Sequence, residues 1–202
     1  GSLVFGSGTN TDNWLNVFSN KLSQFTLNIT NDSLDIASDV INGLINDDIS
    51  NPSYNEDANM SLTAQAITAD SVTNHGNNLT MQATELDGAG IVINGGVEGF
   101  AGSTTKIASA AVLNIKGDVS NSGNMTLNGT QVELASVVND GGDLSITSLT
   151  NEIGQITISG DVTNKSGNTD INAKDIVISG TLTNQSGILT VQGSDTACRL
   201  AQ

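Results

Sequence analysis

Apolar and polar residues alternate along most of the chain from residue 60 to residue 195. Leu127, Leu134 and Ile146, for example, each stand among Thr, Asn and Ser residues. Alternation with a period of two is typical of β-strands that bury one face, and the many Thr, Val and Ile residues also favour strands. Asn-Gly, Asp-Gly and Ser-Gly pairs interrupt the alternation and indicate turns. The pattern therefore predicts an all-β structure.

A short phrase recurs within this pattern: Val or Leu, then Ser or Thr, then Asn, then a turn and an alternating strand. One copy begins with Val72-Thr73-Asn74 and another with Val119-Ser120-Asn121. The repeated asparagines are Asn51, Asn74, Asn121, Asn139, Asn164 and Asn184, at separations of 23, 47, 18, 25 and 20 residues. Because 47 is close to two periods, we expect a degenerate copy near Gly95-Gly96.

A unit of about 20 residues holds two or three short strands and cannot bury its apolar side alone. Units stacked in parallel bury a continuous core, and each strand pairs with its copies in the neighbouring units. Such coils lie about 4.8 Å apart. Only 3% of the residues are aromatic, which fits a core too narrow for large rings. The repeat therefore predicts a parallel β-solenoid over residues 49–193.

The repeated asparagine suits a corner between two strands of a coil. Its side chain can bond nearby backbone groups and stacked copies of itself, and Asn tolerates the left-handed conformation. A glycine that follows it can supply the positive φ of a sharp turn. These glycines are Gly76, Gly123, Gly141, Gly167 and Gly187. We predict that the asparagines and glycines form a structural corner ladder, not a binding site.

The first 48 residues depart from the repeat. Asp12-Asn13 can cap a short helix whose apolar side, at spacings of 4, 4 and 3, consists of Trp14, Phe18, Leu22 and Phe25. We predict that residues 1–48 form a cap with this helix and the first strands, covering the open end of the stack. The alternative is a helical hairpin that docks onto another domain. Residues 194–202 are predicted to be a C-terminal tail.

The chain is strongly acidic, with 6 basic and 21 acidic residues and a formal net charge of −15. This charge repels phosphate backbones and anionic lipid head groups, which argues against nucleic acid and membrane surfaces as partners. No stretch approaches the roughly 18 apolar residues of a membrane span. Gly1-Ser2 resembles a cloning remnant, so we expect a fragment of a longer protein. Cys198, the only cysteine, is either an inert thiol or the partner of a cysteine elsewhere.

The phrase of Val or Leu, Ser or Thr, Asn, any residue, Ser and Gly, as in residues 162–167, resembles the haemagglutinin-type repeats of filamentous haemagglutinin-like adhesins, over about residues 49–193. These exoproteins leave Gram-negative bacteria by two-partner secretion. The resemblance implies a right-handed parallel β-helix at the cell surface, with an outer-membrane transporter as secretion partner. It also implies a role in adhesion, aggregation, virulence or biofilm formation, or as the stalk of a toxin-delivery protein. The family's secretion domain carries Asn-Pro-Asn motifs, which the only proline, in Asn51-Pro52-Ser53, does not match.

Catalytic chemistry has few candidates in the sequence. His75, the only histidine, occupies the same corner position as Ser122, Lys165 and Gln185, so we expect an exposed turn residue. A Ser-His-Asp triad or a histidine zinc site has no other candidate. Gly-rich phosphate loops are missing too. We expect neither an enzyme nor a cofactor or metal.

Three other functions have partial signals in the sequence. Glycosidases need two carboxylates about 5 to 10 Å apart. Asp118 and Asp161 each precede a corner and are candidates to stack, although aromatic platforms for a sugar, such as Phe100, are scarce in the repeats. Residues 139–143 could form a weak calcium site, but a solvated turn is favoured. Thr73, Thr163 and Thr183 share one repeat position, yet the row is too interrupted for an ice-binding surface.

We therefore expect a structural or adhesive segment of a large secreted or cell-surface bacterial protein, or a rigid stalk. Its partner would be a host or matrix receptor, a glycan or a sibling cell. The alternatives are a carbohydrate-active β-helix, meaning a polysaccharide lyase or glycan-binding module, and a self-associating fibre subunit. The stretch Gly88–Thr105 breaks the repeat and is predicted to protrude as a recognition loop.

Overall fold

The computed structural model describes residues 2–5, 17–20, 23–44, 53–148, 154–194 and 198–200, and every regular element in these ranges is a β-strand. Sheet A comprises β1 (Ser2–Phe5), β4 (Ser33–Ile36), β7 (Ile67–Ala69), β10 (Ile91–Ile93), β13 (Val112–Ile115), β16 (Gln131–Leu134), β19 (Gln155–Ile158), β22 (Asp175–Ile178) and β25 (Cys198–Leu200). Sheet B comprises β2 (Val17–Asn20), β5 (Asp39–Asn42), β8 (Val72–Asn74), β11 (Val97–Gly99), β14 (Val119–Asn121), β17 (Val137–Asn139), β20 (Val162–Asn164) and β23 (Leu182–Asn184). Sheet C comprises β3 (Gln24–Asn28), β6 (Asn59–Ala64), β9 (Asn78–Ala83), β12 (Thr104–Ser109), β15 (Asn124–Gly129), β18 (Asp143–Ser148), β21 (Asn168–Ala173) and β24 (Ile188–Gly193).

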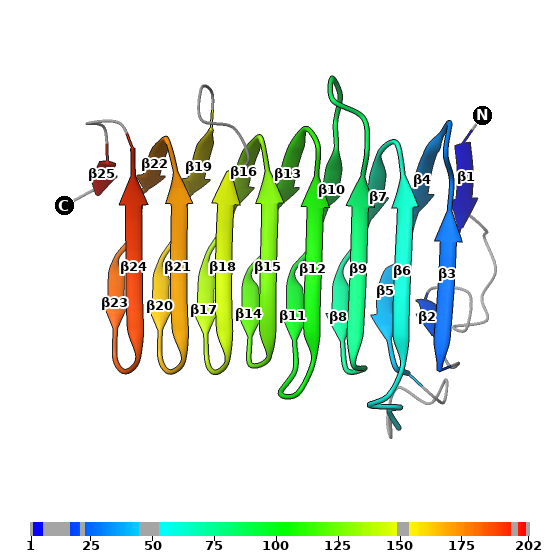
Figure 1. The fold of residues 1–202 in the computed structure, drawn as a ribbon, viewed down its shortest axis with the longest axis horizontal. Coiled ribbons are helices and arrows are strands. Elements are labelled where there is room, and N and C mark those ends of the chain that lie inside the picture. Colours follow the sequence, from blue (N-terminus) through cyan, green and yellow to red (C-terminus); the bar gives the residue numbers. More distant parts are fainter. Residues whose placement is uncertain are drawn as a thin grey trace.

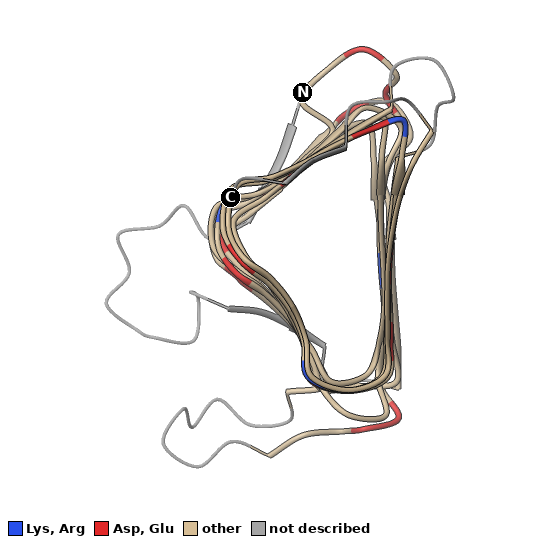
Figure 2. Ribbon diagram, turned by 90° about the vertical axis from the view of Figure 1, so that its left-hand side faces the viewer, with Lys and Arg blue, Asp and Glu red and all other residues tan. Residues whose placement is uncertain are grey.

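The chain visits sheets A, B and C in turn, so each coil has three sides and a triangular outline (Figure 2). Neighbouring strands within each sheet are parallel; for example, β14 pairs with β11 on one side and β17 on the other. In Figure 1 the strands of sheet C run upward in front, the chain returns downward behind, and successive coils advance towards the C-terminal end. This sense is right-handed. The predicted right-handed parallel β-solenoid is confirmed.

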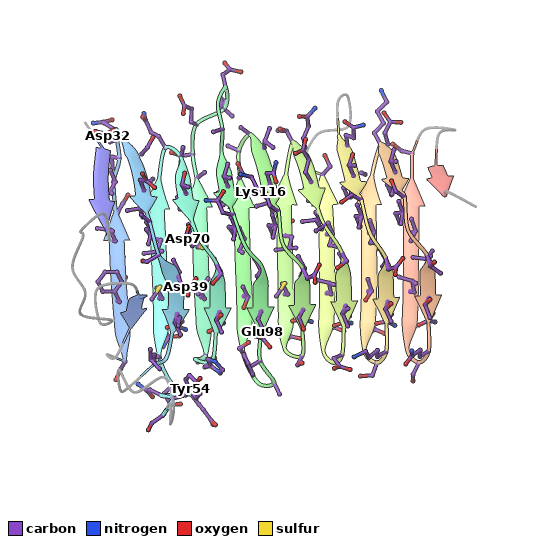
Figure 3. The ribbon with its side chains drawn as sticks, turned by 180° about the vertical axis from the view of Figure 1, so that it is seen from behind. Asp32, Asp39, Tyr54, Asp70, Glu98 and Lys116 are labelled. Carbon is purple, nitrogen blue, oxygen red and sulfur yellow. The ribbon has the colours of Figure 1, made fainter. Side chains whose placement is uncertain are left out.

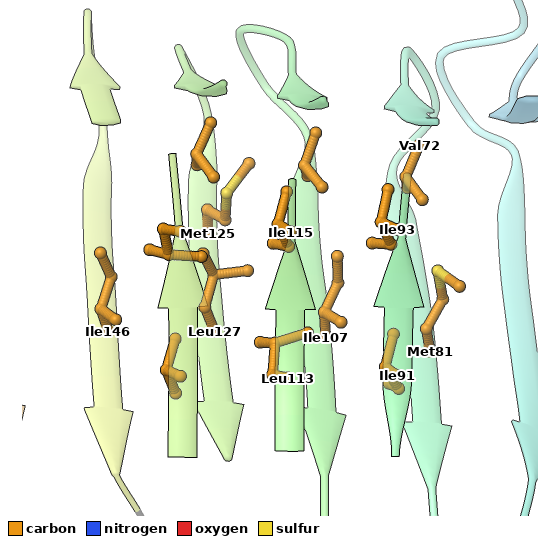
Figure 4. Packing of buried hydrophobic residues seen from close by; sticks show 14 of the residues in the cluster. Val72, Met81, Ile91, Ile93, Ile107, Leu113, Ile115, Met125, Leu127 and Ile146 are labelled. Carbon is orange, nitrogen blue, oxygen red and sulfur yellow. The ribbon is translucent and has the colours of Figure 1, made fainter. Parts of the chain in front are cut away.

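Aliphatic side chains from all three sheets fill the interior. The strands alternate buried and outward residues, as in β13, where Leu113 and Ile115 are buried between outward neighbours. Parallel pairing places equivalent side chains directly above one another, so that Ile91 stacks on Leu113 and Leu113 on Val132. Figure 4 shows these columns meeting at the centre of the coils. Burying each such side chain contributes about 1.5–3 kcal/mol, and the contribution repeats in every coil.

The structure corrects the prediction of an N-terminal helix. Phe18 lies in strand β2 and Phe25 in strand β3, because both segments pair with the next coil of the solenoid. The spacing between Phe18 and Phe25 therefore does not reflect a helix, because the two residues lie in different strands. The other residues of the predicted helix, Asp12, Asn13, Trp14 and Leu22, lie outside the described residues. Strands β1 to β5 and strand β25 belong to the same three sheets, so the solenoid extends beyond the predicted limits of 49 and 193.

The predicted recognition loop Gly88–Thr105 is wrong for most of its length. Strands β10 and β11 and the start of β12 occupy this stretch and pair with both neighbouring coils. The degenerate copy expected near Gly95-Gly96 is this coil, and its place in the stack is confirmed. The bends that do protrude connect β9 to β10, at the top of Figure 1, and β11 to β12, at the bottom. The first carries the exposed side chain of Leu86, and the second lies within the predicted loop.

Two adjacent residues of β15 test the division between core and surface. Leu127 is fully buried, whereas Thr126 points outward. We expect Leu127→Ala to lower the free energy of unfolding by about 2–5 kcal/mol, because it removes core contacts and leaves a cavity. Thr126→Ala should change it by less than about 0.5 kcal/mol. Urea denaturation followed by circular dichroism measures both, and equal losses would contradict the assigned register.

Candidate functional site: the asparagine corner and the outward faces

A ladder of asparagine side chains runs along the corner between sheets B and C. The last residue of each sheet B strand from β5 to β23 belongs to it, and successive rungs are in register. The rungs are Asn42, Asn74, Gly99, Asn121, Asn139, Asn164 and Asn184. In four steps the side-chain amide of one rung donates to the side-chain carbonyl of the next, over 2.8–3.0 Å. Except for Asn184 at the end, the asparagine rungs are fully buried.

The ladder also satisfies backbone groups at the corner. Nδ2 of Asn139, for example, donates to the main-chain carbonyls of Gly142, Ser166 and Asn168. A buried amide without partners would cost about 1–3 kcal/mol, so these bonds make a polar corner compatible with an apolar core. The ladder therefore has the geometry of a structural element that fixes the register of the coils.

The structure places the predicted corner asparagines Asn74, Asn121, Asn139, Asn164 and Asn184 in one column. Asn51 lies outside the described residues. Sequence analysis missed Asn42, which occupies the rung before Asn74. The signal was present as Val40-Ile41-Asn42-Gly43, but Ile41 replaces the usual Ser or Thr, and the segment lay inside the presumed cap.

The corner glycines act for two different reasons. Gly167 and Gly187 have φ near +78°, as predicted, and the column continues through Gly142 at +65°. A Cβ atom on Gly167 would lie only 2.0 Å from the carbonyl oxygen of Gly142 in the preceding coil. Gly76, Gly123 and Gly141 do not have positive φ, so the predicted reason is wrong for them. At Gly76 and Gly123 close backbone approach excludes a side chain instead.

One rung of the ladder has no side chain. Gly99 lies between Asn74 and Asn121. The side-chain amide of Asn74 therefore donates to the hydroxyl of Thr105, at 3.0 Å, instead of to a side chain at position 99. The side-chain oxygen of Asn121 is buried and has no hydrogen-bond partner among the described residues. An asparagine at position 99 would donate its side-chain amide to this oxygen, as the other rungs do.

Gly99→Asn should therefore stabilise the solenoid. A Cβ atom at this position would lie 3.1 Å from the terminal methyl of Met125, which is flexible enough to move, and the backbone has no positive φ. The new amide should satisfy the oxygen of Asn121 and raise the free energy of unfolding by about 1 kcal/mol. Gly99→Ala is the control, because it adds the Cβ without the amide. Thermal denaturation compares the three proteins, and a gain no larger than that of the alanine variant would contradict this account.

His75 lies in an aromatic stack and is not the exposed turn residue that the sequence predicted. Its ring is half-buried between Tyr54, at a centroid distance of 3.5 Å, and Phe100, at 3.7 Å. Phe100 occupies the same corner position in the next coil. Tyr54 arrives from the segment that follows β5, where it forms an isolated bridge with Leu44. Burial lowers the pKa of His75 below 6.5.

A depressed pKa couples the stack to pH. Between the pKa of folded His75 and 6.5, the unfolded chain binds more protons than the folded chain, so stability should rise with pH across this interval. NMR titration of the single imidazole should give a midpoint below 6.5. Phe100→Leu, which uncovers one ring face, should move the midpoint back towards 6.5. A midpoint at or above 6.5 in the unchanged protein would show that the rings favour the imidazolium.

The carboxylates considered for catalysis do not stack on each other. Asp118 and Asp161 share a column just before sheet B, but Ser136 stands between them. The hydroxyl of Ser136 donates to Asp118, and the main-chain amide of Thr181 donates to Asp161 at 2.7 Å. The coils of Asp118 and Asp161 are two steps apart along the stack, or about 10 Å. Each carboxylate therefore has a local partner.

The acidic turn at residues 139–143 also uses its oxygens within the stack. Asp140 forms an exposed ion pair with Lys165 at 3.3 Å, and Asp143 accepts from Asn168 at 2.9 Å. In the part of the chain that the structure describes, no three His, Cys, Asp or Glu residues are grouped as metal ligands. The main chain of Cys198 pairs with Ile176 at the end of sheet A.

The outward faces differ in charge. Acidic side chains such as Asp32, Asp70 and Glu98 project from the bends and strands on the sides of sheets A and B (Figure 3). Sheet C presents three outward positions per strand, and only Lys106, Asp143 and Asp170 among them are charged. Shallow depressions lie between neighbouring coils. One, with a volume of about 320 Å³, is lined by residues that include Asn114, and another, of about 250 Å³, by residues that include Gln82.

The fold defines the class of this protein as a right-handed parallel β-solenoid with a buried asparagine corner. Comparison of the chain with protein-family models, with curated proteins and with solved structures gives no match. Within the described ranges, no helix has the length and apolar character needed to cross a bilayer.

Proposed function

We propose that this chain is a rigid segment of a large secreted or cell-surface bacterial exoprotein, which mediates adhesion or aggregation or serves as a stalk. The β-solenoid fold is compatible with a β-helix adhesin. The haemagglutinin-type phrase in the sequence supports the same assignment. On this proposal, an outer-membrane transporter exports the parent protein, and a host or matrix surface, a glycan or a sibling cell is its partner.

The observation that carries the proposal is the outward side of sheet C. Its eight parallel strands are in register from β3 to β24, and they form one uninterrupted surface along the solenoid (Figure 1). A surface whose strands are all paired is already rigid, so little conformational entropy is lost when a partner binds. Repetition also offers many equivalent contacts, and several weak contacts together give strong attachment.

Rigidity supports the stalk role. Both the backbone pairing and the asparagine ladder run in the direction of the solenoid axis, so each coil is fixed to the next at its strands and, except at Gly99, at its corner. Stability in such arrays is a sum of coil and interface terms. A segment of this kind holds whatever is attached to it at a fixed distance from the cell.

Display of the chain on a non-adherent bacterium tests the proposal. We expect displaying cells to attach to host cells or matrix, or to aggregate with one another, several times more than cells that display an unrelated β-solenoid. A lyase and hydrolase assay on the purified chain runs in parallel, because a carbohydrate-active β-helix is the competing function. Time-dependent depolymerisation of a polysaccharide that Asp118→Asn or Asp161→Asn abolishes would overturn the scaffold assignment. Displaying cells that neither attach nor aggregate would contradict the adhesive role.

A further inference from the structure

Two rows of side chains, most of them uncharged and polar, run along the outward side of sheet C. The hydroxyl row, in the middle of the strands, consists of Thr26, Ser61, Thr80, Lys106, Thr126, Ser145, Asp170 and Thr190. The amide row, two residues further on, consists of Asn28, Thr63, Gln82, Ala108, Asn128, Thr147, Asn172 and Gln192. From this face we propose that sheet C binds an uncharged polysaccharide chain. The proposal rests on the adhesive function proposed above and names its ligand class.

Most hydrogen-bonding groups of these two rows are not used by the protein. Among the described residues, the only side-chain hydrogen bond in either row joins the hydroxyls of Ser145 and Thr147, at 3.3 Å. The outer asparagines nearest the corner behave differently, since Asn78 donates to Asn59 and Asn168 to Asp143. Hydroxyl and amide groups that already face water in a regular array are available to a partner that has both donors and acceptors.

The charge distribution selects the kind of partner. The whole chain has a formal net charge of −15, but one lysine and two aspartates leave the outward side of sheet C at only −1. An acidic polymer would be repelled by the faces of sheets A and B, and sheet C offers no acidic cluster to a basic one. The two rows include one apolar residue, Ala108, so the apolar centre of a typical protein interface is also missing. An uncharged polysaccharide meets all three conditions: it is not repelled by the acidic faces, it needs no acidic cluster, and it binds through hydroxyl groups and not through an apolar centre.

The geometry favours a polymer over a short sugar. Neighbouring rungs of each row are about 4.8 Å apart, the two rows are about 6.6 Å apart, and eight strands extend over about 34 Å. Each hydrogen bond to a sugar replaces one to water, so its net contribution is about 1 kcal/mol or less. Useful affinity therefore requires many contacts along the same ligand.

A depression beside the middle of the amide row adds a place where a ligand can sit below the general surface. It lies over β9 and β12, has a volume of about 250 Å³, and is lined by Gln82, Ala83, Thr84, Ala108, Ser109 and Ala110. The small side chain of Ala108 interrupts the row of amides at this point and makes the space. A lining that combines polar side chains with small ones suits a pyranose ring.

Near-isosteric substitutions test the proposal with little effect on folding. Gln82→Glu adds one charge to the amide row, between Thr63 and Ala108, while Gln131→Glu adds one to the outward side of sheet A, between Val112 and Gln155. The probes are cellulose, chitin and cross-linked dextran particles, with alginate beads as the acidic comparison. Circular dichroism confirms that both variants are folded.

We expect the unchanged chain to be retained on at least one uncharged polysaccharide and not on alginate. The sheet C variant should bind about tenfold more weakly, a difference of about 1.4 kcal/mol, because a carboxylate offers no donor and must give up its hydration. The sheet A variant should bind within about twofold of the unchanged chain. Long fragments of the retained polysaccharide should compete, whereas fragments of two or three sugars should not.

Several results would overturn the inference. They are retention on none of the uncharged particles, stronger retention on alginate, equal losses in the two variants, and sedimentation that shows self-association through sheet C. The cell-display assay separates this inference from the proposed function. If the sheet C variant supports attachment as well as the unchanged chain, the ligand class or face is wrong and the adhesive function stands. If neither protein supports attachment, the proposed function fails.

Discussion

Parallel backbone hydrogen bonds between successive coils are the constraint on which the rest of this structure depends. Because each strand pairs with the equivalent strand of the next coil, every side chain stacks on its own counterpart about 4.8 Å away. A favourable contact, such as Ile91 on Leu113, is then repeated in the next coil by Leu113 on Val132. Unfavourable contacts would be repeated in the same way. The composition follows from this, since few large rings and few like charges can be stacked at such a distance.

The asparagine ladder makes the register unambiguous. Apolar columns alone tolerate substitution of one aliphatic residue for another, whereas a buried amide needs its donor and acceptor at defined positions. Slipping one coil by a single residue would bury the wrong face of its strands and would leave the amide of a residue such as Asn139 without its partners. The coil that contains Gly99 shows that one missing rung is tolerated when Thr105 supplies a hydroxyl.

The three sides of the coil can serve different purposes because only their inward residues share the core. Sheets A and B and their bends carry most of the acidic residues, which keeps the chain soluble and repels polyanions. Sheet C has longer strands and an almost uncharged outward side. The proposed adhesive role and the proposed ligand class both depend on this asymmetry. The insertions fall at bends, as with Tyr54, where they add contacts without interrupting a sheet.

The sequence by itself determined the strands, the solenoid and most of the asparagine column, because alternation and a repeat of about 20 residues have few other solutions. It could not determine that Phe18 and Phe25 lie in strands, since their spacing also fits a helix and only pairing with the next coil excludes it. Nor could it place Tyr54 on His75, or align the hydroxyl and amide rows of sheet C. Those features depend on the lengths of the insertions and on the register between coils, and both are settled only when the coils stack.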